Sequence, residues 1–183
     1  MSASGVGFLV WFGLGWWLLG TSAFDGAARP ILVVMGGAAA LGLRFTARRF
    51  LPRQEAGSLP PDRRRRFRLV NVVQWALIAA VVVGCVSAGV PVLVPPLVAV
   101  VVGLHFLPLV TVFGQPRFRV PAALLVAAGA VGGAVWLAGG PDAAVRLVVG
   151  LLSALSLWGV ATWAAAGAAT AAGRAASGPP PDK

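Results

Sequence analysis

Residues 44–68 of the chain read RFTARRFLPRQEAGSLPPDRRRRFR, and long apolar sequence lies on both sides of them. This stretch holds nine of the fifteen basic residues of the 183-residue chain. The whole chain is 58% hydrophobic and 11% charged, whereas a soluble domain carries roughly 25% charged residues. A protein of this size has too small an interior to bury so much apolar surface, which excludes a soluble globular fold. The composition predicts a multi-pass membrane protein with a basic segment between two of its spans.

Polar and turn-forming residues divide the apolar sequence into six segments. A helix needs about 20 residues to cross a bilayer core of about 30 Å. We expect spans at about residues 6–24, 30–43, 69–87, 90–113, 120–137 and 143–166. The second segment is short, so whether it crosses the whole bilayer is open. The predicted fold class is all-α, an integral membrane bundle of about six transmembrane helices in one domain over residues 1–173, with a basic loop at 44–68 and a disordered tail at 174–183.

The distribution of basic residues predicts the orientation of the spans. Four more basic residues fall on the same side as the 44–68 segment: Arg117, Arg119, Arg174 and Lys183. Only Arg29 and Arg146 fall on the other side. Because cytoplasmic loops carry the excess of Lys and Arg, both termini are predicted to be cytoplasmic. No basic residue precedes the first apolar segment, so we expect it to be a retained helix rather than a signal peptide, in the plasma (inner) membrane of a bacterium.

One ionisable side chain, His105, lies well inside an apolar segment. Such residues are costly in a membrane and indicate a functional site by default. Pro108, three residues later, has no amide hydrogen for the carbonyl of Leu104, which predicts a kink in the fourth span. Asn71 and Gln74 are three residues apart on one face of the third span. If either faces His105, these groups form a small polar site.

Two interpretations of this polar site stay open. In the first, His105, Asn71, Gln74 and Pro108 bind or translocate a small solute or ion at the kinked fourth helix. In the second, His105 pins two helices through a hydrogen bond worth about 0.6–2 kcal/mol, and the protein is a structural or regulatory membrane component that acts through its basic loop. No catalytic motif is present, so we do not expect an enzyme. With one His and the single Cys85, we expect neither a metal site nor a cofactor.

The densest basic run consists of Arg63, Arg64, Arg65, Arg66 and Arg68. Nucleic-acid binding would require aromatic platforms or a folded reading element, neither of which fits in this loop. Anionic lipid head groups attract each basic residue near the surface by roughly 1 kcal/mol. We therefore predict that these arginines fix the topology and contact head groups at the cytoplasmic face of the bilayer, with no nucleic-acid partner.

Small and aromatic residues suggest how the helices pack. Closely spaced small residues occur in three spans: Gly36, Gly37 and Ala40; Gly129 and Gly133; Ala161, Ala165 and Ala169. Such faces allow close approach of two helices, either within one chain or in a homodimer. Trp16 and Trp17 approach the outer end of the first span, where amphipathic rings favour the bilayer interface.

Residues 67–119 resemble an uncharacterised family of small bacterial multi-pass membrane proteins. The likeness rests on the basic entry into the third span, Arg64-Arg-Arg-Phe-Arg-Leu-Val-Asn71, and on the Gly-Leu-His-Phe-Leu-Pro-Leu run at 103–109. The resemblance implies a bacterial inner-membrane protein and draws attention to His105. It implies no reaction, because that family has no assigned activity.

Overall fold

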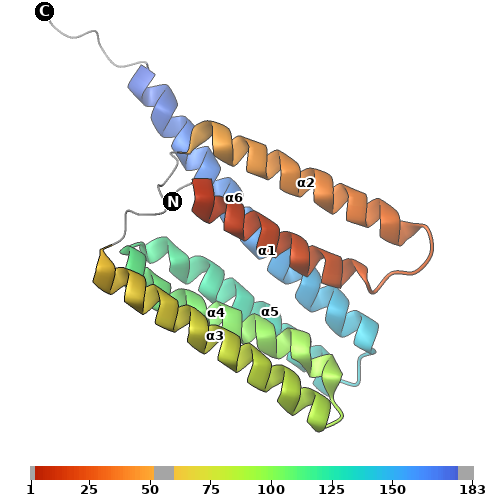
Figure 1. Ribbon diagram of the computed structural model, residues 1–183. Helices are drawn as coiled ribbons and strands as arrows, with labels where there is room; N and C mark the ends of the chain where they lie inside the picture. The colour runs from red at the N-terminus through yellow and green to blue at the C-terminus, as the bar shows by residue number, and fades with distance from the viewer. Residues whose placement is uncertain (1–2, 52–59, 177–183) are drawn as a thin grey trace, which may run out of the picture.

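The computed structural model describes residues 3–51 and 60–176, and within these ranges the secondary structure is helical (Figure 1). The long helices are α1 (Ala3–Thr21), α2 (Ala28–Phe50), α3 (Pro61–Ser87), α4 (Val94–Phe113), α5 (Arg119–Leu137) and α6 (Asp142–Ala176). Two short 3-10 turns, η1 (Pro91–Leu93) and η2 (Pro116–Phe118), precede α4 and α5. The all-α bundle predicted from the sequence is confirmed.

Five helices, α2 to α6, are long and apolar enough to cross a membrane. The sixth, α1, is apolar and has 19 residues, a length of about 28 Å at about 1.5 Å per residue. The second predicted span is no longer short, because α2 has 23 residues and continues to Phe50. The protein is therefore a multi-pass membrane protein.

The helices lie side by side in the order α2, α1, α6, α5, α4, α3 (Figure 1). Apart from α2 and α3, sequence neighbours pack against each other as antiparallel pairs, and the first and last helices, α1 and α6, make the most extensive contact of all. α6 also reaches α2 on one side and α4 on the other. α2 and α3, which flank the basic segment, form the two edges of the bundle.

The α1–α6 contact is built from glycines and one tryptophan. The two backbones meet at Gly20 and Gly150, where a Cβ atom on Gly150 would collide with the backbone of α1 and one on Gly20 would lie in tight contact with α6. The indole Nε1 of Trp158 donates a hydrogen bond to the carbonyl of Val10. Without a driving force from water, such close contacts and interhelical hydrogen bonds hold helices together in lipid.

Trp16 and Trp17, which the sequence places near the outer end of the first span, contact neighbouring helices. Trp16 is only 7% exposed, and the indole Nε1 of Trp17 donates a hydrogen bond of 2.8 Å to the carbonyl of Leu32 on α2. The ring of Trp17 stacks on that of Trp158, with 5.3 Å between their centroids. Both tryptophans pack against neighbouring helices, because α1 lies between α2 and α6.

The small-residue faces pack within the chain. Gly36 of α2 faces the ring of Trp17, and Gly129 of α5 lies against the backbone of Pro96 and Val100 on α4. Ala40, Ala161 and Ala165 are buried. Gly37 and Gly133 face open space. For the enclosed residues, packing within one chain is the interpretation that the structure supports.

Several helices extend further than the predicted spans. Residues 44–50 continue α2 and residues 61–68 open α3, so the predicted loop at 44–68 is reduced to the connection at 51–60. Arginine is a good helix former, and Pro61 occupies the first helical position, where proline is favoured. The part of this connection at 52–59 lies outside the described residues. α6 runs on to Ala176, so helix covers the first three residues of the predicted tail, and the remainder, 177–183, also lies outside them.

Candidate functional site

His105 lies on the side of α4 that packs against α3. The two helices run antiparallel, and their register is marked by the edge-on contact of Phe67 with Phe113, whose ring centroids are 5.7 Å apart. His105 is half-buried and its ring interacts with the backbone of Val70 on α3. The predicted site residue is therefore at a helix–helix interface rather than on the lipid-facing surface.

The two nitrogens of the imidazole have different surroundings. Nδ1 is buried and has no hydrogen-bond partner. The neutral ring carries its proton on one of its two nitrogens, so Nδ1 is available either as a hydrogen-bond donor or as an acceptor. In the described part of the chain one other buried side-chain atom lacks a partner, Oγ of Ser153 on α6. A buried polar atom without a hydrogen-bond partner costs about 1–3 kcal/mol, so the Nδ1 atom calls for an explanation.

The turn of α3 that faces His105 also carries Asn71 and Gln74. In an α-helix the carbonyl of residue 70 accepts the backbone hydrogen bond of residue 74, so the Val70 carbonyl points toward Gln74. Gln74 is only 9% exposed and Asn71 is half-buried. Their side chains make no hydrogen bond to His105 within the described residues. Sequence reasoning anticipated the side chains on this turn but missed the contact with Val70, because a backbone carbonyl leaves no mark in a residue pattern.

Pro108 lies one turn beyond the carbonyl of Leu104. α4 extends from Val94 to Phe113 and continues as a helix through Pro108. Because proline has no amide hydrogen, the Leu104 carbonyl, directly before His105, lacks its usual helical donor. The hydroxyl of Thr111 donates to the Pro108 carbonyl at 2.8 Å. The surroundings of His105 thus combine backbone and side-chain groups that are available for hydrogen bonding.

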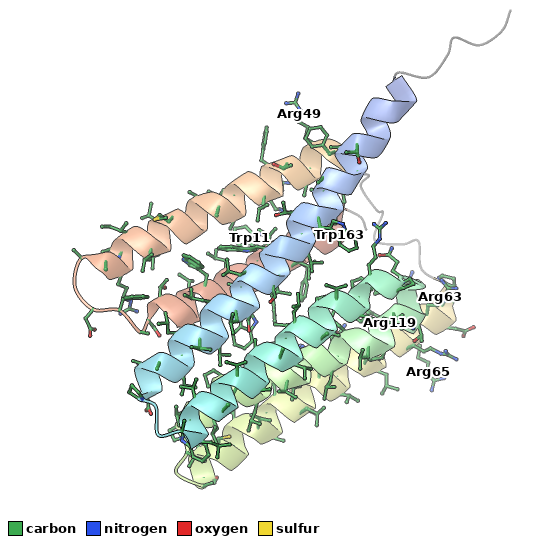
Figure 2. The ribbon with its side chains drawn as sticks, turned by 180° about the vertical axis from the view of Figure 1, so that it is seen from behind. Trp11, Arg49, Arg63, Arg65, Arg119 and Trp163 are labelled. Carbon is green, nitrogen blue, oxygen red and sulfur yellow. The ribbon has the colours of Figure 1, made fainter. Side chains whose placement is uncertain are left out.

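Charge is distributed very unevenly between the two ends of the bundle. Arg49 of α2, Arg63 and Arg65 of α3, and Arg119 of α5 all lie at one end (Figure 2). At this basic end the described residues include one acid, Asp62. The opposite end carries four charged residues, which balance: Asp25, Arg29, Asp142 and Arg146. Helix packing therefore brings arginines from separate segments of the sequence to one end of the bundle. The arrangement of spans predicted from the sequence requires this.

Arg117 connects this basic end to α6. α4 ends at Phe113 and is capped by Gly114, whose positive φ of 65° is a backbone conformation that glycine favours at helix C-termini. The short η2 turn that follows carries Arg117, whose guanidinium carbon lies 5.1 Å from the ring centroid of Trp163. This cation–π contact joins the α4–α5 turn to the last helix. The two residues are far apart in the sequence, so sequence reasoning did not find this contact.

The described residues contain no cluster of three or more His, Cys, Asp or Glu side chains that would hold a metal ion. Cys85 is buried and unpaired. Compared with models of known protein families, with curated proteins and with solved structures, the chain matches none.

Proposed function

We propose that this multi-pass membrane protein binds a small polar solute between α3 and α4, with His105 as the central contact. The observation that supports the proposal is the buried Nδ1 atom without a partner. A solute that supplies the missing hydrogen bond removes the cost of that unpaired polar atom, and this gain favours binding. The side chains of Gln74 and Asn71, on the facing turn of α3, supply additional donors and acceptors.

The chemistry of the site indicates which solutes to expect. Nδ1 of a neutral imidazole either donates or accepts a hydrogen bond, so the solute needs a polar group such as a hydroxyl or an amide. The neighbouring turns of α3 and α4, residues 69–78 and 101–110, contain no Asp, Glu, Lys or Arg. A charged solute would have no counter-charge there, and an unpaired charge is expensive in a low-dielectric interior. Small uncharged molecules with hydroxyl or amide groups are therefore the favoured class.

A ligand screen with matched variants tests the proposal. The purified protein, in nanodiscs, is unfolded by heat in the presence of small polyols, amides and urea. A solute at 100 times its dissociation constant adds about 2.7 kcal/mol of stability. We expect at least one solute to stabilise the wild type but neither His105→Phe nor Gln74→Leu. Thr111→Val is the control, because its hydroxyl lies on the same helix and bonds only to the Pro108 carbonyl.

The screen has a clear negative outcome. If no solute stabilises the wild type, or if each one stabilises His105→Phe equally well, His105 holds no solute. If binding is found, uptake by proteoliposomes shows whether the solute is also moved across the membrane, with His105→Phe vesicles as the reference. We expect faster uptake through the wild type for the solute that binds.

A structural or regulatory role is the second candidate, and the arginine-rich end of the bundle favours it. In that case His105 fastens α4 to α3 through Val70. His105→Phe would then lower the melting temperature by the same amount with every solute. The biological activity would depend on the arginines at the helix ends and be insensitive to the polar groups between α3 and α4.

A further inference from the structure

Arg44 occupies an unusual position near the basic end of α2. It lies six residues before Phe50, the last residue of the helix, and its side chain is half-buried. The guanidinium lies directly against Gly7 in α1, so closely that a Cβ atom at Gly7 would collide with it. Gly7 itself is buried. The absence of a side chain at Gly7 creates the space that the guanidinium fills.

This guanidinium has no counter-charge. Within residues 3–51 and 60–176, the Arg44 side chain makes neither an ion pair nor a hydrogen bond. The one described acid at this end, Asp62, begins α3, at the opposite edge of the bundle from α2 (Figure 1). A half-buried guanidinium without acceptors is unfavourable, since its five N–H donors remain unmatched by protein groups. An anion bound there would satisfy them.

The depth of Arg44 matches the level of lipid head groups. Six residues of helix correspond to about 9 Å, and each head-group layer of a bilayer is about 5–8 Å thick. The Cα atom of Arg44 thus lies near the boundary between the apolar core and the head groups, where a long basic side chain reaches outward to lipid phosphates. Gly7, four residues into α1, lies at a corresponding depth.

The neighbouring residues of α2 complete a site for one lipid molecule. Arg48 is one turn further along the same face and is exposed. Leu41, about one turn from Arg44 toward the bilayer core, and Phe45, which is 65% exposed, present apolar surface next to these arginines. A guanidinium binds phosphate oxygens through paired hydrogen bonds, which gives the contact geometry as well as charge.

We propose that Arg44, seated against Gly7 and assisted by Arg48, binds the phosphate of an anionic phospholipid whose acyl chains lie along α2. This site differs from the general attraction of head groups to the exposed arginines of α3, because it depends on one packed side chain. It also lies on the opposite edge of the bundle from His105, so the solute-binding proposal and this one fail independently.

The experiment compares two variants that remove the same charge from the same end of the protein. The full chain is placed in phosphatidylcholine nanodiscs with an increasing mole fraction of phosphatidylglycerol, and bound lipid is counted by native mass spectrometry. We expect Arg44→Gln to weaken phosphatidylglycerol binding about tenfold, the ratio that the loss of one charge-assisted hydrogen bond produces. Arg65→Gln, on an exposed residue of α3, should leave binding within about twofold of the wild type.

Three further measurements test the geometry of the site and the source of the phosphate. Arg44→Lys keeps the charge but loses the planar fork, so we expect part of the affinity to be lost. Gly7→Ala places a methyl group where the guanidinium lies, and we expect it to reduce lipid binding even though Arg44 is present. Inorganic phosphate added to pure phosphatidylcholine nanodiscs should neither raise the melting temperature nor displace phosphatidylglycerol.

Three outcomes would overturn the proposal. Equal losses in Arg44→Gln and Arg65→Gln would show general attraction by charge. Unchanged binding in Arg44→Gln would show that the guanidinium holds no lipid. Stabilisation by inorganic phosphate to the same extent as by phosphatidylglycerol would show a site for the free anion. Because Arg44→Gln and Arg44→Lys introduce no bulk, they keep the test decisive even if Gly7→Ala fails to fold.

Discussion

The indole Nε1 of Trp158, on the last helix, donates a hydrogen bond of 3.1 Å to the backbone carbonyl of Val10, on the first helix. Gly13 makes the approach feasible, because a Cβ atom there would lie 2.5 Å from the same indole nitrogen. Trp158 is 8% exposed and also stacks on Trp17. One side chain therefore connects the two helices that are most distant in sequence and have the largest contact in the bundle.

This relationship predicts the effect of Trp158→Phe. The phenyl ring retains most of the apolar contact but has no N–H donor. The Val10 carbonyl keeps its backbone hydrogen bond within α1, so no acceptor is left unpaired. We expect a loss of about 1 kcal/mol in the free energy of unfolding, within the range for interhelical hydrogen bonds in membranes. Unfolding in nanodiscs or bicelles measures it.

Trp11→Phe is the matched control for this substitution. Trp11 lies on α1 and is largely exposed (Figure 2). No hydrogen bond of its indole to a described residue is found. We expect its replacement to change stability by less than half as much. Equal effects of the two variants would contradict a specific role for the Trp158 to Val10 hydrogen bond.

The crossing of α1 and α6 predicts that Gly150→Ala is destabilising. A methyl group at this position would meet the backbone of Gly20 and lie 2.7 Å from the carbonyl oxygen of Trp16. These are backbone atoms, so the helices must separate to make room. Overpacking of this kind costs about 1–3 kcal/mol.

Gly159→Ala, on the same helix, provides the comparison. A Cβ atom at Gly159 meets nothing within 4 Å. Alanine is also the better helix former, by up to about 1 kcal/mol. The melting temperature should therefore fall for Gly150→Ala and stay level or rise for Gly159→Ala. A fall of the same size in both variants would show that backbone flexibility, rather than the crossing, determines the effect.

The surroundings of Gly129 and Gly133 on α5 predict different effects on stability for the same substitution to alanine. A Cβ atom at Gly129 would lie 2.5 Å from the carbonyl oxygen of Pro96 and 3.1 Å from the amide nitrogen of Val100 on α4. At Gly133 it would meet nothing within 4 Å. We expect Gly129→Ala to lower stability by about 1–3 kcal/mol and Gly133→Ala to be neutral.

The same two variants also test the homodimer interpretation of this motif. If Gly133 lay at an interface between two copies, Gly133→Ala would weaken association. Size-exclusion chromatography with light scattering in detergent measures the oligomeric state directly. We expect the two variants to have the same state as the wild type, since Gly129 is enclosed by α4 of its own chain.

The sequence best predicted the features that depend on the length of the apolar segments and on the distribution of charge. Apolar length predicted six helices, and the excess of arginine on alternate connections predicted a basic end, which the structure assembles from α2, α3 and α5. The order of the helices in space was not predictable in this way. Apolar side chains gain little by leaving lipid for protein, so hydropathy does not distinguish neighbours. The pairing of α1 with α6 instead depends on a few close contacts, such as Gly20 with Gly150.

The candidate site was predictable only in part, for a related reason. The rarity of an ionisable group in an apolar span singled out His105, and helical spacing placed Asn71 and Gln74 on one face. The group that contacts the imidazole is the backbone of Val70, and every residue has a backbone carbonyl. Likewise, the packing of Arg44 on Gly7 depends on how α1 and α2 are aligned, which neither residue reveals alone.

Accessibility of single cysteines reports the orientation of the bundle in the membrane. Cys85 is the single cysteine of the chain, so Cys85→Ala gives a cysteine-free background. Single cysteines are then introduced at Ala27, at Ala138 and at Gln115, in three different turns. Because cytoplasmic loops carry the excess of Arg, an impermeant maleimide should label Ala27→Cys and Ala138→Cys on intact cells. Gln115→Cys, beside Arg117, should react only after permeabilisation.

The fold supplies an internal check on this labelling experiment. The α1–α2 and α5–α6 turns lie at the same end of the bundle, while the α4–α5 turn lies at the other end (Figure 1). The Ala27 and Ala138 positions must therefore behave alike, whichever way the protein is inserted. The reverse pattern, with only Gln115→Cys labelled from outside, would place the basic end and both termini outside the cytoplasm. Labelling of Ala27→Cys but not of Ala138→Cys would contradict six membrane crossings, since an even number of spans between equivalent turns requires both to face the same side.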